Sequence, residues 1–174
     1  RLMPHFHLSA QSGDDMILKR MKRRHARKDT IEFCDAVRRL RPDVAFGADL
    51  IAGFPTETDA MFENTKALIG DAGLSYLHIF PFSPRKGTPA ARMPQVAKPL
   101  VKERAARLRA KGEEALSARM SALVGSEQVL LVEKQGLGRT ACFAQARFTG
   151  DTQPGQMIRV RVTDATQTQL IAMQ

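Results

Sequence analysis

Polar side chains stand near the ends of short apolar stretches, where the sequence enters loops containing Gly or Pro. Asp49 lies within GADLIA and precedes the turn at Gly53, and Gln11 follows another short strand-like segment. A carboxylate and an amide can hydrogen-bond hydroxyl groups such as those of a ribose. Gly53 would let a ligand approach the backbone closely. The pattern indicates a nucleoside-like or amino-acid-like ligand, and the alternative is that Asp49 only caps or pairs locally.

Three further residues occupy comparable positions along the chain. They are Ser9, Ser83 and Arg23. The two serines follow or end predicted strands, and Arg23 belongs to a basic stretch on the helix after the first strand. A guanidinium can form a forked pair with a carboxylate, so Arg23 suits the acidic end of such a ligand.

His5 and His7 form the one histidine pair with a strand spacing. Side chains two residues apart in a strand point to the same face, so the pair could bind a metal ion, but no third ligand is evident from the sequence. We therefore favour a structural or substrate-lining role for both rings. Neither G-x-x-x-x-G-K-[ST] nor G-x-G-x-x-G occurs in the chain, which excludes the common phosphate-binding loops.

The elements that must position these residues alternate between strand and helix. Apolar patterning predicts strands over residues 5–10, 44–52 and 76–80, and helices over 14–21, 29–40 and 59–73. Asp29 with Glu32, and Thr56 with Asp59, are candidate capping pairs. The alternation predicts parallel strands with helical crossovers, and the site is expected at their carboxyl ends. Three such units are too few for a closed barrel and fit one half of it.

The second half of the sequence has a different pattern of apolar and turn residues. A loop rich in Pro, Arg and Gly over 83–97 leads into a long charged helix, predicted over 99–124. From residue 128 short segments of period-two character alternate with Gly, Asp and Pro, as in a small antiparallel barrel of OB-like type. Cys142 is expected on one of its strands and Cys34 on a helix. The predicted domain boundary lies between residues 123 and 124.

Composition limits the function classes. The chain has 174 residues, is 43% hydrophobic and carries a formal net charge of +9. No apolar run approaches the roughly 20 residues of a membrane helix, so we expect no membrane partner. Basic residues gather over 19–28 and 98–111; such clusters attract polyanions, nucleic acid first, or are merely solvated helix faces. The two cysteines are too far apart for a chelating C-x-x-C pair and are expected to be buried in a reducing cytosol.

Several stretches together resemble a known family. They are PHFHLSAQSGDDMILKRMKRR, GADLIAGFPTETDAMFENT, YLHIFPFSPRKGTPAARMPQV and KERAARL. In this order they are similar to the radical S-adenosylmethionine methylthiotransferases. Within that family, HIFPFSPRKGTPAARMPQV with VKERAARL is most similar to the MtaB branch, which methylthiolates N6-threonylcarbamoyladenosine beside the tRNA anticodon at C2 of the adenine. The neighbouring branches are MiaB (isopentenyladenosine in tRNA) and RimO (an aspartate of a ribosomal protein).

The resemblance implies a fold and a set of ligands. The chain would hold the C-terminal half of a partial (β/α)6 barrel over residues 1–123, followed by an RNA-binding TRAM domain over 124–174. The implied cofactors are S-adenosylmethionine and two [4Fe-4S] clusters. The implied partners are tRNA, a reductant and a sulfur source. We expect a cytoplasmic monomer.

The resemblance also assigns residues. Those expected at S-adenosylmethionine are Ser9, Gln11, Arg23, Asp49, Ile51, Gly53 and Phe80. Those expected at RNA are Arg85, Lys86, Lys134, Arg139 and Arg147. In the tail segment GRTACFAQARF, Ala141 and Ala144 stand where the family's pattern leads us to expect polar residues.

One departure from the family is decisive for catalysis. The cluster-binding C-x-x-x-C-x-x-C is absent, and Cys34 and Cys142 match neither cluster set. We therefore expect a fragment that holds no cluster, contains no catalytic residue of its own and is inactive alone. Two alternatives stay open: the MiaB-like or RimO-like branch, and a non-catalytic RNA-binding module.

Overall fold

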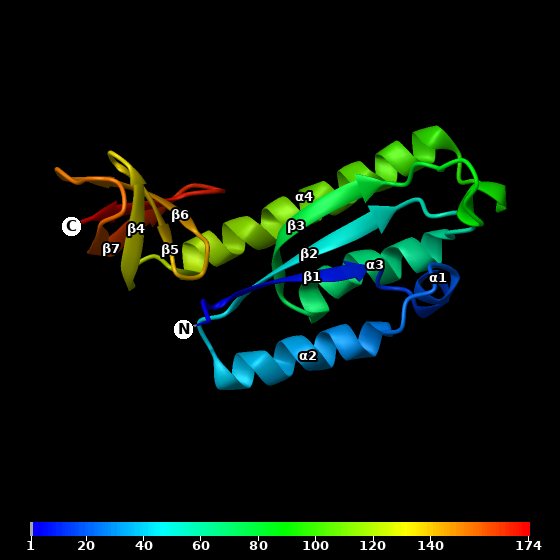
Figure 1. Cartoon of the computed structure of the whole chain (residues 1–174), viewed down its shortest axis with the longest axis horizontal. Helices are drawn as coiled ribbons and strands as arrows, with labels where there is room; N and C mark the ends of the chain where they lie inside the picture. The colour runs from blue at the N-terminus through cyan, green and yellow to red at the C-terminus, as the bar shows by residue number, and fades with distance from the viewer. Residues whose placement is uncertain (1) are drawn as a thin grey trace.

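A three-stranded parallel sheet forms the first part of the molecule. The computed structural model describes residues 2–174. The strands are β1 (His5–Gln11), β2 (Ala45–Ala52) and β3 (Leu74–Pro81), in the order β1-β2-β3. All pairs are parallel, with Phe6 opposite Phe46 and Asp49 opposite His78. The predicted alternation of strand and helix is confirmed, and the carboxyl ends of all three strands meet at one edge (Figure 1).

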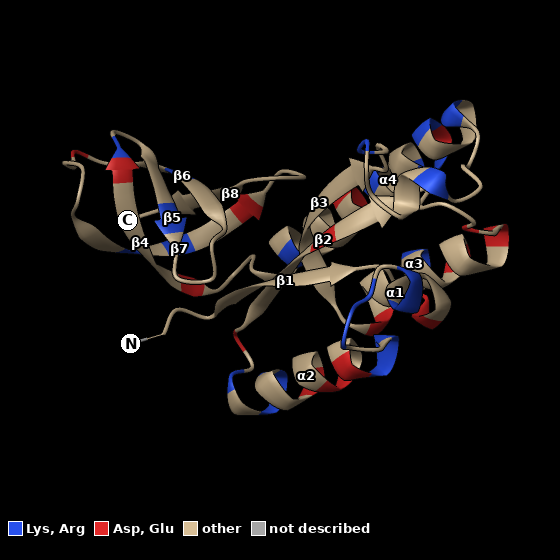
Figure 2. Cartoon of the chain, turned by 45° about the vertical axis from the view of Figure 1, so that its right-hand side comes forward, with Lys and Arg blue, Asp and Glu red and all other residues tan. Residues whose placement is uncertain are grey.

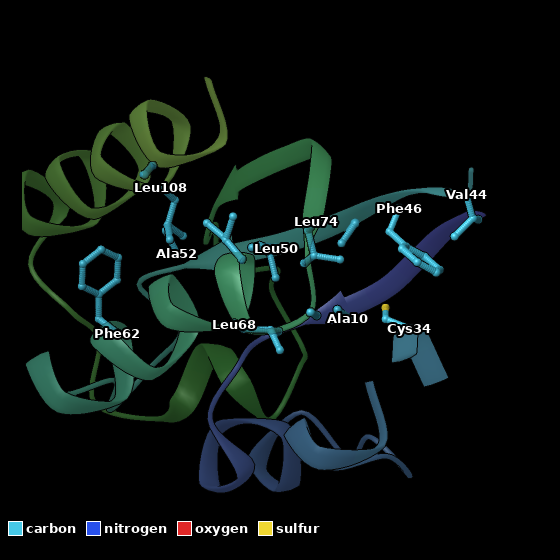
Figure 3. Close-up of a cluster of buried hydrophobic side chains, with 14 residues drawn as sticks. Ala10, Cys34, Val44, Phe46, Leu50, Ala52, Phe62, Leu68, Leu74 and Leu108 are labelled. Atoms are coloured by element: carbon cyan, nitrogen blue, oxygen red, sulfur yellow. The ribbon is translucent and has the colours of Figure 1, made fainter. Parts of the chain in front are cut away.

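Helices pack against one face of this sheet. They are α2 (Arg27–Leu40), α3 (Asp59–Asp71) and α4 (Lys98–Ala122), whereas the short helix α1 (Asp15–Arg20) lies in the connection between β1 and α2. Alternate residues of β2, Phe46, Leu50 and Ala52, are almost fully buried in one hydrophobic cluster with Cys34 of α2. The same cluster takes in side chains of α3 and α4, among them Leu68 and Leu108 (Figure 3). The opposite face of β2 presents Gly47, Asp49 and Ile51.

Two helix starts differ from the prediction. Helix α2 begins at Arg27, because Asp29 accepts a hydrogen bond from the backbone N–H of Ala26 at 2.8 Å and so lies inside the first turn. Helix α3 is capped by Thr58, whose hydroxyl accepts from the backbone of Met61. Thr56, the predicted cap, instead occupies the turn before it with φ +66°.

Helix α4 connects the sheet to the second part of the molecule. A short 3-10 helix, η1 (Ala90–Arg92), precedes it. Gly112 allows close packing on β3, since an added Cβ there would lie 3.0 Å from Leu77. In Figure 1, α4 runs along β3 and ends beside the barrel.

The second part is a closed five-stranded barrel. Its strands are β4 (Glu127–Lys134), β5 (Leu137–Thr140), β6 (Gln145–Thr149), β7 (Met157–Ala165) and β8 (Leu170–Met173), ordered β4-β5-β6-β8-β7. Most pairs are antiparallel, but β6 and β8 run parallel, which makes the barrel mixed. Alternating burial along β7, with Ile158, Val160 and Val162 inside, follows the period of two. The predicted fold class is confirmed.

Two details of the second part bear on the sequence analysis. Cys142 lies in the turn between β5 and β6 and not on a strand. The core of the barrel includes Ala45 of β2 and Met120 of α4, so it is continuous with the first part. The boundary at 123/124 therefore stays a prediction. Within residues 2–174, no helix is both long and apolar enough to cross a membrane.

Candidate functional site

A cavity of about 590 Å³ opens at the carboxyl edge of the sheet. Gln11, Asp49, Ile51 and Phe80 line it, so the structure brings four of the seven predicted cofactor residues together. Arg85, a predicted RNA residue, lines the same cavity from the loop after β3. The four come from the ends of three parallel strands. That common edge is why residues far apart in sequence meet here.

Gly53 lies just beyond this cavity. It lines a neighbouring one of about 340 Å³, together with Val101 and Lys102 of α4. Its φ is +74°, and an added Cβ would lie 2.5 Å from Val101. Both facts require glycine at this position. The close approach inferred from the sequence is therefore to α4 in this structure.

Ser9 and Arg23 lie in a separate, shallow cavity of about 350 Å³. It is also lined by His25 and Phe33 and belongs to the side of β1 that faces α2. Neither residue lines the cavity of Gln11 and Asp49. Arg23 was expected on the helix after the first strand, but α1 ends at Arg20 and Arg23 lies in the loop before α2. The path of that loop decides which side of β1 Arg23 reaches, and the sequence could not show it.

Asp49 is the centre of a cluster on the open face of the sheet. His7 Nε2 lies 2.8 Å and His78 Nδ1 lies 3.2 Å from the same carboxylate oxygen, Oδ1. The two rings are tilted by 35° with centroids 4.7 Å apart. Sequence reasoning found His7 but no third ligand, and His78 was missed. The sequence did not show this contact, because it depends on the strand register that places His78 opposite Asp49 across β2 and β3.

His5 serves a different purpose from His7, although both rings lie on this face. Its ring stacks on Phe143 of the barrel at 4.7 Å and meets Tyr76 edge-on. Burial, with the nearby His7 and Arg119, lowers the pKa of His5 below its ordinary value. Burial likewise raises the pKa of Tyr76 to about 12. His5 and Tyr76 connect the sheet to the barrel, and both pKa shifts favour the uncharged side chain.

The turn after β2 is held by a buried ion pair. Arg104 of α4 donates to Glu57 Oε1 at 2.9 Å and to the Glu57 carbonyl at 3.0 Å, while the backbone N–H of Gly53 donates to the same Oε1. Arg104 also bonds Asp59 at 2.5 Å. Burial raises the pKa of Glu57 against the opposing effects of its Gly53 and Arg104 partners. Arg104, counted in a basic cluster by the sequence, is thus part of the interior.

The predicted RNA residues fall at two ends of the molecule. Arg85 and Lys86 are exposed on the loop after β3, whereas the other three lie on the barrel. Arg139 donates to Glu133 at 2.7 Å and covers the Phe143 ring at 4.4 Å, and Arg147 donates to Gln169. Lys134 is exposed at the end of β4. Figure 2 shows basic residues on the helices as well as on the barrel strands.

Sequence reasoning missed two exposed arginines of β7. Arg159 and Arg161 alternate with the buried residues of that strand and point outward. The period of two in MIRVRV was the signal that could have found them.

The two cysteines do not form a metal or cluster centre. Cys34 is fully buried on the helix side of the sheet, and Cys142 is buried in the barrel core. Burial raises the pKa of the Cys34 thiol to about 11, which opposes formation of the thiolate that binds iron. The thiols of this chain therefore do not fit an iron–sulfur cluster.

Comparison with known proteins finds similarity to a superfamily model and to tRNA-modifying enzymes. Residues 2–69 match the family model of the radical SAM superfamily. The threonylcarbamoyladenosine tRNA methylthiotransferase MtaB of Rickettsia prowazekii (strain Madrid E) is 52% identical over 162 residues, which cover 93% of this chain and 38% of the relative.

Two further relatives carry another name. The tRNA-2-methylthio-N(6)-dimethylallyladenosine synthase of Cereibacter sphaeroides (strain ATCC 17025 / ATH 2.4.3) is 40% identical over 171 residues, 94% of this chain and 39% of the relative. That of Erythrobacter litoralis (strain HTCC2594) is 37% identical over 172 residues, 95% of this chain and 39% of the relative. The chain spans about two fifths of the length of these curated relatives.

Proposed function

Because the chain belongs to the radical S-adenosylmethionine methylthiotransferase family, we propose that it is the C-terminal part of a tRNA-modifying enzyme. The enzyme would add a methylthio group to C2 of N6-threonylcarbamoyladenosine next to the anticodon. One observation carries this branch: identity is 52% with a threonylcarbamoyladenosine enzyme against 40% and 37% with two dimethylallyladenosine enzymes, over nearly the same residues.

S-adenosylmethionine is the cofactor we propose for the cavity at the sheet edge. When bound, it supplies the adenosyl radical and the methyl group. The residues present fit such a molecule: the Gln11 amide and Asp49 suit ribose hydroxyls, and Ile51 with the half-exposed Phe80 offers an apolar surface for a base. Gly53 remains a proposed contact from the neighbouring cavity, and Ser9 and Arg23 remain proposed contacts although they line the separate cavity on the α2 side of β1.

The clusters would come from outside this chain. Its two buried thiols do not fit them, so we propose that the remainder of a longer enzyme holds both [4Fe-4S] clusters. A reductant and a sulfur source would be its other partners, and the isolated chain would be inactive. We place the whole enzyme in the cytoplasm, with its tRNA, as a monomer.

Analysis of tRNA nucleosides tests the branch. The complete gene that encodes this chain is expressed in a strain lacking the modification. The tRNA nucleosides of that strain are then separated and identified by mass spectrometry. We expect 2-methylthio-N6-threonylcarbamoyladenosine to return. Its absence, with 2-methylthio-isopentenyladenosine appearing instead, would move the chain to the MiaB-like branch. A methylthiolated ribosomal protein would indicate the RimO-like branch.

The barrel would be the tRNA-binding part, a TRAM domain. The formal net charge of +9 and the outward arginines of the barrel strands support this role. A non-catalytic RNA-binding module is the alternative that shares these features. This alternative predicts that the chain binds tRNA with the same affinity, but that expression of the complete gene yields no methylthiolated nucleoside.

A further inference from the structure

The open face of the sheet carries three metal-ligand groups that the proposed function does not require together. His7, Asp49 and His78 each offer one ligand atom, and these atoms all lie within 4.8 Å of one another. The two nitrogens lie 2.8 and 3.2 Å from Asp49 Oδ1. Ligands about 2.0–2.1 Å from a tetrahedral zinc ion are roughly 3.3 Å apart. Shifts of a few tenths of an ångström would bring the two nitrogen–oxygen distances to this value, and the two nitrogens, which lie within 4.8 Å of each other, would adjust with them.

The backbone holds these groups in place. Asp49 and His78 are register partners on adjacent parallel strands, and His7 reaches across from β1 over Gly47. A Cβ on Gly47 would lie 2.5 Å from His7 Nδ1 and 2.8 Å from the Tyr76 carbonyl. Only glycine at position 47 lets the His7 ring lie flat enough over β2 to reach Asp49. The cluster is thus built by strands, which position ligands more rigidly than loops do.

The surroundings leave room beside the cluster. His7 and His78 line a cavity of about 590 Å³ to which α4 adds one charge of each sign, Arg109 and Glu113. The His7, Asp49 and His78 side chains are 32%, 28% and 66% exposed. In this chain, an ion bound here would reach solvent and keep coordination positions open for water or another ligand.

We infer that His7, Asp49 and His78 form a binding site for a divalent transition-metal ion of the zinc type. Two imidazoles with one carboxylate suit Zn²⁺, Co²⁺ or Fe²⁺, whereas Mg²⁺ and Ca²⁺ prefer sets made only of oxygen ligands. Three protein ligands with an open fourth position are typical of reactive and not of purely structural zinc sites. His5, although paired with His7 in sequence, is no ligand, because its ring is stacked between the barrel and Tyr76.

Titration of the 174-residue chain with Zn²⁺ and Co²⁺ tests the site. Calorimetry should show about one equivalent of Zn²⁺, and Co²⁺ should give the visible absorption of a low-coordinate site. Loss of a ligand in His7→Ala, Asp49→Asn or His78→Ala should weaken Zn²⁺ binding at least about tenfold. His25→Ala is the matched control, since His25 bonds only the Ala10 carbonyl among the hydrogen bonds of the described residues. Mg²⁺ should not compete.

A second pair of variants separates site geometry from general damage. Gly47→Ala changes no ligand but displaces the His7 ring, so it should weaken Zn²⁺ binding as the ligand variants do. Gly70→Ala is its control, because a Cβ there meets nothing within 4 Å. Far-UV circular dichroism shows which variants fold, and the exposed His78 gives one ligand variant whose folding should be unaffected.

Three results would overturn the inference. They are no stoichiometric Zn²⁺ binding, binding that survives in folded His78→Ala, and binding lost equally in His25→Ala. The titration uses no tRNA, S-adenosylmethionine or cluster, so its failure is distinguishable from failure of the proposed function.

Discussion

His5 shows how one buried side chain makes stability depend on pH. Its Nε2 atom is buried and has no hydrogen-bond partner within residues 2–174, and burial lowers its pKa. A proton therefore binds the unfolded chain more readily than the folded one. The stability that His5 contributes is present above the unfolded pKa, about 6.5, and is lost as the pH falls through the lower folded value.

The prediction concerns urea unfolding between pH 7.5 and pH 5. The midpoint of the unchanged chain should fall over this range, and His5→Phe should lose less, since phenylalanine keeps the stack on Phe143 without titrating. The two unfolding series are followed by circular dichroism. An equal fall in both chains would contradict the assignment to His5.

For single residues, the sequence predicted which side chains line the cavity better than it predicted which side chains contact each other. Gln11, Asp49, Ile51 and Phe80 were expected at one ligand and do line one cavity, because parallel strands end at a common edge. His78 was missed because its contact with Asp49 depends on strand register, which composition and periodicity do not specify. Arg23 lies apart because the turn before α2 directs it to the other side of β1.

The link between the β2–α3 turn and α4 is the main polar contact between elements. Arg104 and Glu57 are 2% and 1% exposed at their side chains, so each charge depends on the other for solvation. Removal of one partner from a buried pair costs about 3–5 kcal/mol. A solvated pair such as Lys111 with Glu114 on the same helix is worth at most about 1 kcal/mol.

Arg104→Met should therefore lower the free energy of unfolding by about 3–5 kcal/mol, because it leaves the buried Glu57 carboxyl without its ion-pair partner. Lys111→Ala on the same helix should change it by less than about 1 kcal/mol. Urea unfolding at neutral pH measures both. Similar small losses in both variants would mean that the Arg104 pair is not a structural link.

Element boundaries show a comparable mixture of success and failure. The strands and helices were predicted to within a few residues, since apolar periodicity is strong in each. The two helix caps were misplaced because several neighbouring residues can cap. The hydrogen bonds of Asp29 and Thr58 decide between them. Arg104 was read as solvated because the sequence cannot show which face of α4 lies on α3.

Across the whole molecule, some basic side chains are paired with carboxylates and others point outward into solvent. Much of the basic run on α4 is paired, as in Arg107 with Glu63, whereas β7 presents Arg159 and Arg161 outward. We therefore propose that the tRNA surface centres on the β7 side of the barrel rather than on α4. The half barrel and the small barrel could be predicted from the periodicity of apolar residues and the placement of turn residues. The continuity of their cores through Ala45 and Met120 could not, because it depends on how the two parts meet.

tRNA binding by the 174-residue chain should show this division. The logarithm of the affinity should fall steeply with the logarithm of salt concentration, and Arg161→Ala should reduce the slope by about 1. Lys28→Ala on α2, exposed and beside Glu32, is the control and should leave the slope unchanged. Filter binding or fluorescence anisotropy measures both. A flat slope, or equal effects of the two variants, would contradict a barrel surface.

The central claim is the identity of the adenosine that is modified. The most direct measurement offers the complete, anaerobically reconstituted protein equal amounts of two tRNAs, one with N6-threonylcarbamoyladenosine and one with isopentenyladenosine, and weighs the nucleoside products. The account predicts methylthiolation of the threonylcarbamoyl nucleoside. Methylthiolation of the isopentenyl nucleoside alone, or no methylthiolated nucleoside from a protein with both clusters bound, would contradict it.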